Sequence, residues 1–150
     1  MNESWASSEG ARRTMIANRR RDTQPELRVR RILHAAGLRY RVDVAPLPGL
    51  RSRADIVFTK QRVAVFIDGC FWHGCPTHAV APKANADYWG PKLARNRARD
   101  LEVSKRLTES GWEVLRFWEH EPPKDVARVI LKKWILSSRS LRTTCTPLKN

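Results

Sequence analysis

The sequence is short of acidic residues: 15 Asp and Glu stand against 29 Lys and Arg in 150 residues, which gives a formal net charge of +14. So large a positive charge on a small protein favours a polyanionic partner, and nucleic acid is the natural one. The alternative is a solvated basic surface. The positive charge is concentrated in residues 12–31, 92–106 and 128–150, which predicts separate contacts with phosphates.

Long hydrophobic runs and a recognisable signal peptide are also missing. No apolar stretch approaches the roughly 20 residues that a membrane-spanning helix needs, so the sequence predicts a soluble protein with no membrane partner. Cysteine is scarce as well, at three residues. A reducing, cytoplasmic location is therefore the expectation, and a disulfide is the weaker interpretation of any cysteine pair.

The length allows one domain with a single core, and 41% hydrophobic residues support a folded one. Residues 1–21 lack steady periodicity and are rich in Ser, Ala and Arg, which is typical of a basic, flexible arm. We expect the folded domain over residues 22–138 and a disordered basic tail over residues 139–150.

The hydrophobic patterns predict an α/β fold in which a mixed sheet is flanked by helices. Thr23 and Glu26 fit a capping box that starts the first helix, and Gly37 ends it. Two short apolar runs separated by a polar turn predict a hairpin of buried strands. The expected elements are a helix up to residue 36, strands 38–44, 54–58 and 63–67, a helix over 91–110, a strand over 112–118 and a helix over 125–136.

One loop has the spacing of metal ligands. Cys70, Cys75 and His78 form a C-x4-C-x2-H pattern, which can present two thiolates and an imidazole to one tetrahedral zinc ion. The remaining candidates for a fourth ligand are His34, His73, His120 and Cys145. His120 is favoured because it follows a strand-like run that can hold it rigidly. The alternative is that both cysteines are small buried apolar groups.

His73 lies in the same loop, and if zinc takes the other four ligands it is free to move protons. The alternative is a structural, hydrogen-bonded imidazole. Asp100 shares a helical stripe with Leu93 and Leu107, which is unusual for a carboxylate that has no task. It can orient His73 as a general base, or it can pair with a neighbouring arginine or serine.

Asp55 begins a strand whose next three residues are apolar, so its carboxylate is expected at the end of a sheet. A hard cation such as Mg²⁺ binds such a carboxylate together with waters and phosphate oxygens. The alternative is an aspartate that accepts hydrogen bonds from backbone N–H groups. Glu26 has two interpretations as well, as a capping residue or as an acid that holds a water beside the metal.

Aromatic residues stand on polar segments next to basic ones. Phe71, Trp72 and Trp89 can act as a wedge between base pairs. The alternative for each is core packing.

Taken together, these motifs resemble the very short patch repair (Vsr) DNA mismatch endonucleases, over about residues 12–136. The order and spacing of the segments make this resemblance more specific than any single motif. The matching segments are Arg21-Asp-Thr-Gln-Pro-Glu26; Leu47-Pro-Gly with Ala54-Asp55; Gly69-Cys-Phe-Trp-His-Gly-Cys-Pro76; Tyr88-Trp89 with Lys92, Asn96 and Arg99-Asp100; and Gly111-Trp-Glu-Val with Trp118-Glu119.

The resemblance implies the restriction-endonuclease fold and an enzyme that nicks one strand 5′ to the thymine of a T:G mismatch left by deamination of 5-methylcytosine. It implies that Asp55 and the main-chain carbonyl of Ile67 bind Mg²⁺, that His73 is the general base with Asp100 as its orienting partner, and that Glu26 is an accessory acid. The implied structural zinc ligands are Cys70, Cys75, His78 and His120. The implied DNA-intercalating residues are Phe71, Trp72, Trp89 and Met15.

The chain departs from the usual restriction-fold pattern, which has a second acid and a lysine on the strand after the first carboxylate. Here the nearest acid is Asp68, and Cys70 stands where a lysine is expected. Whether Asp68 also binds the metal is left open by the sequence. His120 occupies a position where cysteine is common in relatives, an exchange that zinc tolerates.

The expected partner is double-stranded DNA with a T:G mismatch, bound by a monomer because the mismatch has no two-fold symmetry. The resemblance also implies a bacterial, nucleoid-associated enzyme that works beside other mismatch-repair proteins and a cytosine-5 methyltransferase system. Two alternatives stay open at this point. One is a related restriction-type endonuclease for another mismatch or sequence, and the other is a zinc-braced DNA-binding module without catalysis.

Overall fold

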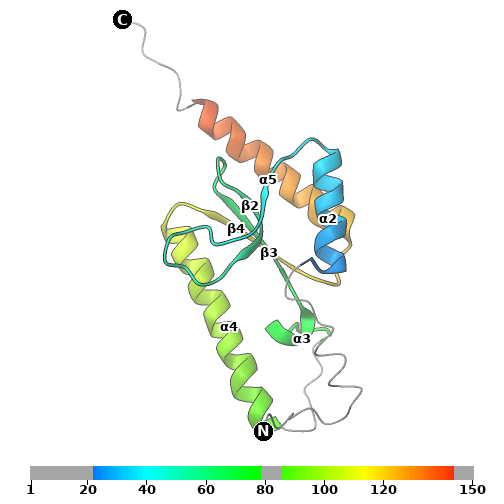
Figure 1. Cartoon of the computed structure of the whole chain (residues 1–150), viewed down its shortest axis with the longest axis vertical. Helices are drawn as coiled ribbons and strands as arrows, with labels where there is room; N and C mark the ends of the chain where they lie inside the picture. The colour runs from blue at the N-terminus through cyan, green and yellow to red at the C-terminus, as the bar shows by residue number, and fades with distance from the viewer. Residues whose placement is uncertain (1–21, 79–85, 144–150) are drawn as a thin grey trace, which may run out of the picture.

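The computed structural model describes residues 22–78 and 86–143 (Figure 1). Four strands form one sheet, and helices cover both of its faces. The elements are α2 (Gln24–Ala35), β1 (Arg41–Val44), β2 (Ala54–Phe58), β3 (Val63–Asp68), α3 (Cys70–His73), α4 (Ala86–Glu109), β4 (Glu113–Trp118) and α5 (Pro123–Thr143). The prediction of a mixed α/β fold is confirmed.

The sheet has the strand order β1-β2-β3-β4. β1 with β2 and β2 with β3 pair antiparallel, so the predicted hairpin is present, whereas β4 runs parallel to β3. A parallel pair needs a crossover connection, and here α3 and α4 supply it. The C-terminal ends of β3 and β4 therefore lie at the same end of the sheet, where α3 begins.

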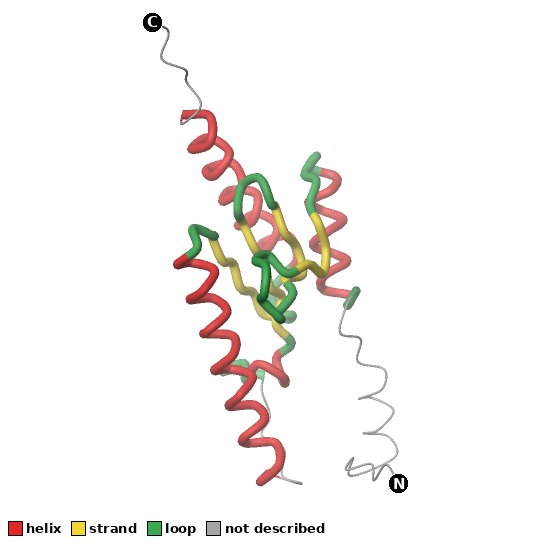
Figure 2. The backbone as a smooth tube through the Cα atoms, turned by 60° about the vertical axis from the view of Figure 1, so that its left-hand side comes forward, coloured by secondary structure: helices red, strands yellow, loops and turns green. Residues whose placement is uncertain are grey.

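Two hydrophobic clusters hold the layers together. One lies between the sheet and the helices α2 and α5, with Val29, Leu33 and Ile130 among its buried members. The other lies between the opposite face of the sheet and α4, where Val103 and Leu107 are buried. Figure 2 shows the strands between α4 on one side and α2 on the other. Because alternate residues of β3 face opposite layers, the strand is an almost continuous apolar run.

The start of α2 differs from the predicted capping box. Thr23 is the N-cap, but its side chain makes no bond to the helix backbone. Instead its Oγ1 donates to Glu26 Oε1 at 2.9 Å, and the N–H of Asp22 donates to Glu26 Oε2 at 3.0 Å. Both carboxylate oxygens of Glu26 thus accept hydrogen bonds, which fix the orientation of this side chain. The Thr23 side chain does not cap the first N–H groups of the helix.

Both long helices exceed their predicted bounds. α4 begins at Ala86 rather than at Pro91, because Trp89 is buried at 8% exposure and the preceding turn of helix brings it into the interior. Pro91 lies inside the helix, in its second turn, where it has no N–H to donate to the carbonyl of Asp87. α5 continues to Thr143, so residues 139–143 are helical and not part of a disordered tail. No glycine or proline stops this helix before its last turn.

Two smaller differences concern β1 and the metal loop. β1 starts at Arg41 rather than at residue 38, because Leu38 completes the end of α2, with its N–H donating to the carbonyl of Leu33 at 3.1 Å. The predicted loop after β3 contains a short helix, α3, that ends at Gly74 in the left-handed conformation. Among the described residues, no helix is both long and apolar enough to cross a bilayer.

Candidate active site and metal cluster

Asp55 lies at the end of the sheet where β3 gives way to α3. Its Oδ2 accepts the backbone N–H of Ile67 at 2.6 Å, which binds β2 to β3 at this point. The two residues that the sequence suggested as Mg²⁺ ligands are therefore neighbours, although they are twelve positions apart in the chain.

The surroundings of Asp55 suit a cation. Burial raises the pKa of its carboxyl to about 7, and the negative charges of Glu26 and Asp68 add to that rise. The Ile67 N–H and the charge of Arg30 act in the opposite direction. A carboxylate whose ionised form is disfavoured by burial and by other acids gains most from a bound positive charge. The oxygen donors present are those that Mg²⁺ prefers.

Glu26, at the start of α2, is 3% exposed, and its charge acts on the carboxyl of Asp55. Arg30, one helical turn on, donates from Nη2 to Glu26 Oε2 at 3.0 Å and from Nη1 to Asp22 Oδ1 at 2.6 Å. Buried carboxylates need such donors. Arg30 was not predicted as a site residue. Its signal is weak, because it is one arginine among many in a basic segment.

His73 and Asp100 are brought together from α3 and α4. His73 Nδ1 forms a short hydrogen bond with Asp100 Oδ2. Burial lowers the pKa of His73, but the hydrogen bond to Asp100 and the negative charges of Asp68 and Asp100 outweigh it, so the pKa lies above its ordinary value. Arg116 opposes that rise. The predicted contact between these two residues is present, and their catalytic roles stay predictions.

Sequence reasoning missed Arg116 in β4. Its Nη1 donates to both carboxylate oxygens of Asp68, at 3.0 Å and 2.9 Å, and its Nη2 donates to the main-chain carbonyl of Asp100 at 3.4 Å. A signal was available: Arg116 is the one charged residue between the apolar positions of Val-Leu-Arg-Phe-Trp in the predicted strand. A charged residue inside a buried strand needs a partner of the opposite charge.

The four predicted zinc ligands form one cluster. The ligand atoms of Cys70, Cys75, His78 and His120 all lie within 4.8 Å of one another. The Sγ of Cys70 is 3.1 Å from Nδ1 of His120, and the Sγ of Cys75 is 3.8 Å from Nδ1 of both His78 and His120. These separations suit a tetrahedral ion bound at about 2.0–2.3 Å from each atom. The residues present therefore fit zinc.

The two thiols differ in acidity. Burial raises the pKa of Cys70 to about 11, and the neighbouring Cys75 adds to the rise. For Cys75, burial also acts upwards, but hydrogen bonds from Thr77 and His78 outweigh it and lower the pKa to about 6. One thiolate is thus favoured before any metal binds, whereas two thiolates need a positive ion between them. Cys145 lies outside the described residues.

The predicted aromatic wedge is only partly covered by the structure. Trp89 is buried in α4, with its ring edge-on to Tyr88 at 5.2 Å between centroids. Phe71 and Trp72 lie in α3, and the structure describes their backbone alone. Met15 lies outside the described residues. The intercalating roles of these residues therefore stay predictions.

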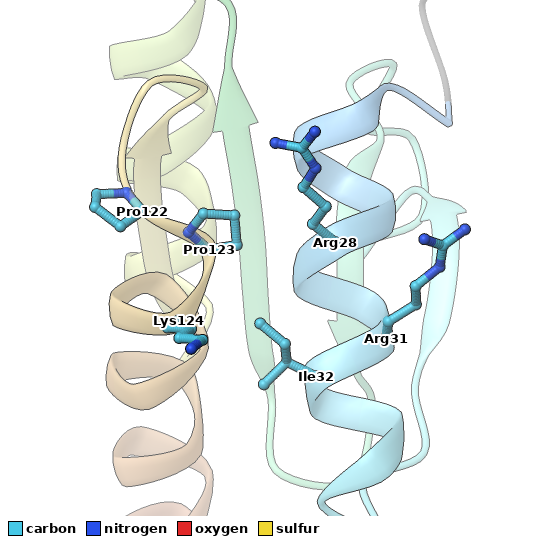
Figure 3. A pocket seen from close by; sticks show the side chains of 6 residues that line it. All are labelled: Arg28, Arg31, Ile32, Pro122, Pro123 and Lys124. Carbon is cyan, nitrogen blue, oxygen red and sulfur yellow. The ribbon is translucent and has the colours of Figure 1, made fainter.

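A basic groove opens between α2 and the start of α5. It has a volume of about 470 Å³ and is lined by Arg28, Arg31, Ile32, Pro122, Pro123 and Lys124 (Figure 3). The floor is apolar, and the three cations are exposed. Such a surface can accept a phosphate backbone, because its charges are accessible and a neutral floor lies between them.

Comparison with known proteins identifies related chains. The sequence profile of the family described as "DNA mismatch endonuclease Vsr" matches residues 7–78. The type II nicking enzyme V.NaeI of Lentzea aerocolonigenes is 49% identical over 124 residues, which cover 81% of this chain and 75% of the relative. The DNA mismatch endonuclease Vsr of Escherichia coli K12 is 39% identical over 109 residues, which cover 71% of this chain and 67% of the relative.

A solved structure has the same fold. The catalytic domain of the homing endonuclease I-Bth0305I superposes with a TM-score of 0.52 at 19% sequence identity, and the match covers 77% of this chain and 98% of that domain. At this identity the likeness concerns the fold alone. The shared fold is consistent with the four-stranded mixed sheet described above.

Proposed function

The chain belongs to the Vsr family of DNA mismatch endonucleases and is an endodeoxyribonuclease, and on this premise we propose that it nicks one strand of duplex DNA at a T:G mismatch in a Mg²⁺-dependent reaction. The nick falls 5′ to the thymine left by deamination of 5-methylcytosine. The names of the relatives, which are nicking enzymes and a mismatch endonuclease, support this choice over cleavage of both strands.

The observation that carries the proposal is the His73–Asp100 hydrogen bond with Asp68 3.8 Å from the same ring nitrogen, since the charge of Asp68, like that of Glu26, also acts on the buried carboxyl of Asp55. An acid that suits a cation and a histidine oriented by a carboxylate are the two parts that phosphodiester hydrolysis needs. They come from β2, α2, α3 and α4, so the tertiary fold has assembled groups that are distant in sequence.

Each residue has a defined task. His73 binds Asp100 through Nδ1, which leaves Nε2 as the nitrogen that accepts a proton from the attacking water. Asp100 fixes the ring and stabilises its protonated form. Glu26, held by Arg30, positions the water. Asp55 and the main-chain carbonyl of Ile67 hold Mg²⁺, which when bound stabilises the negative charge that develops on the phosphate. As phosphorus accepts the water oxygen, its bond to the leaving oxygen breaks.

Zinc at Cys70, Cys75, His78 and His120 braces this machinery rather than taking part in it. Cys70 begins α3 and His73 ends it, so fixing the metal ligands fixes the general base. Glu119 contributes to the same junction, because its Oε1 accepts the N–H of Cys70 at 3.0 Å.

Contacts with the phosphate backbone come from exposed cations on two sides of the site. Arg28, Arg31 and Lys124 line the groove between α2 and α5, and α4 presents further exposed arginines, among them Arg95 and Arg99. Phe71 and Trp72 form the wedge at the mismatch, and Met15 inserts from the other groove, whereas Trp89 is buried in α4 and reaches the DNA only if binding exposes it. The protein binds as a monomer, which sedimentation with and without DNA tests.

The test compares the wild-type chain with Asp55→Asn on labelled duplexes that carry T:G or C:G in varied contexts, with and without Mg²⁺. We expect a single nick 5′ to the mismatched thymine, present only with Mg²⁺ and absent in the variant. Asp125→Asn is the matched control, since Asp125 is exposed and pairs only loosely with Arg128 at 3.6 Å. It removes the same charge and retains nicking.

Other outcomes have distinct meanings. Nicking at a different mismatch or at a fixed sequence in matched DNA replaces the T:G specificity with that of a related restriction-type endonuclease. An Asp55→Asn variant that nicks as fast as Asp125→Asn removes Asp55 from the metal site and overturns the assignment of roles.

A further inference from the structure

Arg116 occupies a central position beside the general base. It stands on β4, opposite Phe66 of β3 in the parallel register, on the face of the sheet that α4 covers. In addition to its contacts with Asp68 and Asp100, its Nε donates to Ser104 Oγ at 2.9 Å. The guanidinium carbon lies 4.2 Å from the centre of the Phe66 ring. One side chain therefore ties β3, β4 and α4 together.

The contacts of Arg116 are largely shielded from water. The exposed fraction of the side chain is 23% for Arg116, 12% for Asp68 and 19% for Asp100. Ion pairs gain strength when solvent is excluded, and breaking one leaves a poorly solvated charge behind. The aromatic face of Phe66 restricts the guanidinium further, because a planar cation stacks on an aromatic ring.

Two carboxylates compete for one nitrogen of His73. Nδ1 is hydrogen-bonded to Asp100 Oδ2, and Asp68 Oδ1 lies only 3.8 Å from the same Nδ1. An imidazole nitrogen carries one hydrogen and serves one acceptor well. Arg116 binds both oxygens of Asp68, so Asp100 is left as the acceptor that orients the ring.

We propose that Arg116 is a positioning residue of this nuclease: by binding Asp68, it reserves His73 for Asp100 and withholds the Asp68 carboxylate from the catalytic metal. This inference rests on the proposed role of His73 as the general base. It also answers the question that the sequence leaves open, because it assigns Asp68 to a brace and not to the ligands of Mg²⁺.

The same arrangement predicts how the residues depend on one another. When Arg116 is removed, Asp68 becomes an unpaired carboxylate close to His73, and the ring can turn towards it or alternate between two partners. When Asp68 is removed as well, the competitor is gone and Asp100 keeps the ring. The decrease in nicking rate on losing Arg116 is therefore caused mainly by the unpaired carboxylate of Asp68.

The experiment uses the full chain with zinc bound and measures the single-turnover nicking rate at saturating enzyme on a T:G duplex, together with the Kd for the same DNA. The variants are Arg116→Met, Arg116→Lys, Asp68→Asn and the double variant with Asp68→Asn and Arg116→Met. Arg62→Met is the matched control, because Arg62 is exposed in the turn between β2 and β3. Zinc content and melting temperature are measured for each protein.

We expect Arg116→Met to slow nicking by about 10- to 100-fold, the range for residues that orient a functional histidine, with little change in Kd. Lysine restores part of the rate, since it supplies the charge without the planar fork. The double variant recovers most of the loss, and Asp68→Asn alone slows nicking less than Arg116→Met, because Arg116 keeps its contact with the main-chain carbonyl of Asp100. The Mg²⁺ concentration for half-maximal rate is unchanged in Asp68→Asn.

A readout without catalysis separates this proposal from the general-base assignment. Nitrogen NMR of His73 reports which ring nitrogen carries the hydrogen, and we expect the wild-type pattern in the double variant and a changed one in Arg116→Met. A wild type that does not nick T:G DNA refutes the proposed function but leaves the NMR prediction standing.

Three results overturn the inference. The first is wild-type nicking and an unchanged His73 spectrum in Arg116→Met. The second is a double variant as slow as Arg116→Met, which removes the competition by Asp68. The third is a shifted Mg²⁺ requirement in Asp68→Asn, which makes Asp68 a metal ligand. If Arg116→Met loses zinc or fails to fold, the Asp68→Asn and double variants decide.

Discussion

Two clusters of functional side chains flank α3, and they are built in opposite ways. The metal cluster takes Cys70, Cys75 and His78 from one short segment and adds only His120 from afar. The proposed catalytic residues are dispersed, with Asp55 on β2, His73 on α3 and Asp100 on α4. The two clusters therefore share α3, which carries Cys70 of the metal cluster and His73 of the proposed catalytic cluster. A metal ion bound by the first cluster would fix the position of α3, and the second cluster depends on that position.

The clusters also differ in charge. The metal cluster consists of thiols and imidazoles, the ligands that zinc prefers. The catalytic cluster consists of carboxylates held by arginines, with Glu26 bound to Arg30 and Asp68 bound to Arg116. In the second cluster the protein itself supplies most of the countercharge, and only Asp55 is left in surroundings that favour a bound cation.

The largest effect is expected from a substitution in the metal cluster. Cys75→Ser removes a ligand, and structural zinc sites bind with an apparent free energy of about 10 kcal/mol or more, so we expect loss of zinc, a melting temperature lower by roughly 20–40 °C, and loss of nicking. Atomic absorption and thermal melting measure the first two. Cys145→Ser is the control and keeps all three properties; zinc loss there makes Cys145 a ligand.

The second prediction separates the clusters. His73→Ala should slow nicking by about 10²- to 10⁴-fold because the proton acceptor is lost, while zinc content and stability stay as in the wild type. His34→Ala, on the exposed side of α2, is the matched control and should nick normally. Retained nicking in His73→Ala shows that the histidine is structural, and zinc loss there shows that the clusters share a ligand.

The third prediction concerns DNA binding beside the clusters. Replacing both Arg28 and Arg31 by Ala should weaken binding uniformly across sequences and lower the dependence of log Kd on log salt by about 2, one for each lost phosphate contact. Fluorescence anisotropy at several salt concentrations measures it. The control replaces Lys60 and Arg62, exposed cations of the turn between β2 and β3. An equal effect in the control assigns the binding to overall charge.

The smallest effect is expected at the start of α2. Thr23→Ala removes the 2.9 Å hydrogen bond to Glu26 Oε1 and should lower the free energy of unfolding by about 1 kcal/mol, with a modest decrease in nicking rate. Urea unfolding measures the first quantity. Thr59→Ala, exposed in the turn after β2, is the control. A Thr23→Ala variant as stable as the control shows that Arg30 alone holds Glu26.

Local patterns predicted the elements well where periodicity was strong, as in the hairpin of β2 and β3. They were wrong at the ends of α4 and α5, because a helix end is decided by whether its next turn finds something to pack against. Trp89 is an example: its burial extends α4 beyond the proline that suggested a start. The clustering of Cys70, Cys75, His78 and His120 was predictable because three of these residues share one loop.

By itself, the sequence determined the charge of the protein, the metal-ligand spacing and the alternating strands, since each depends on residues close together in the chain. Only the tertiary structure decided that Arg116 lies between Asp68 and Asp100 and that the charge of Glu26 acts on Asp55. The physical reason is that a buried charge is stable only beside its partner, and the parallel register of β3 with β4, together with the docking of α4, sets which partner it meets.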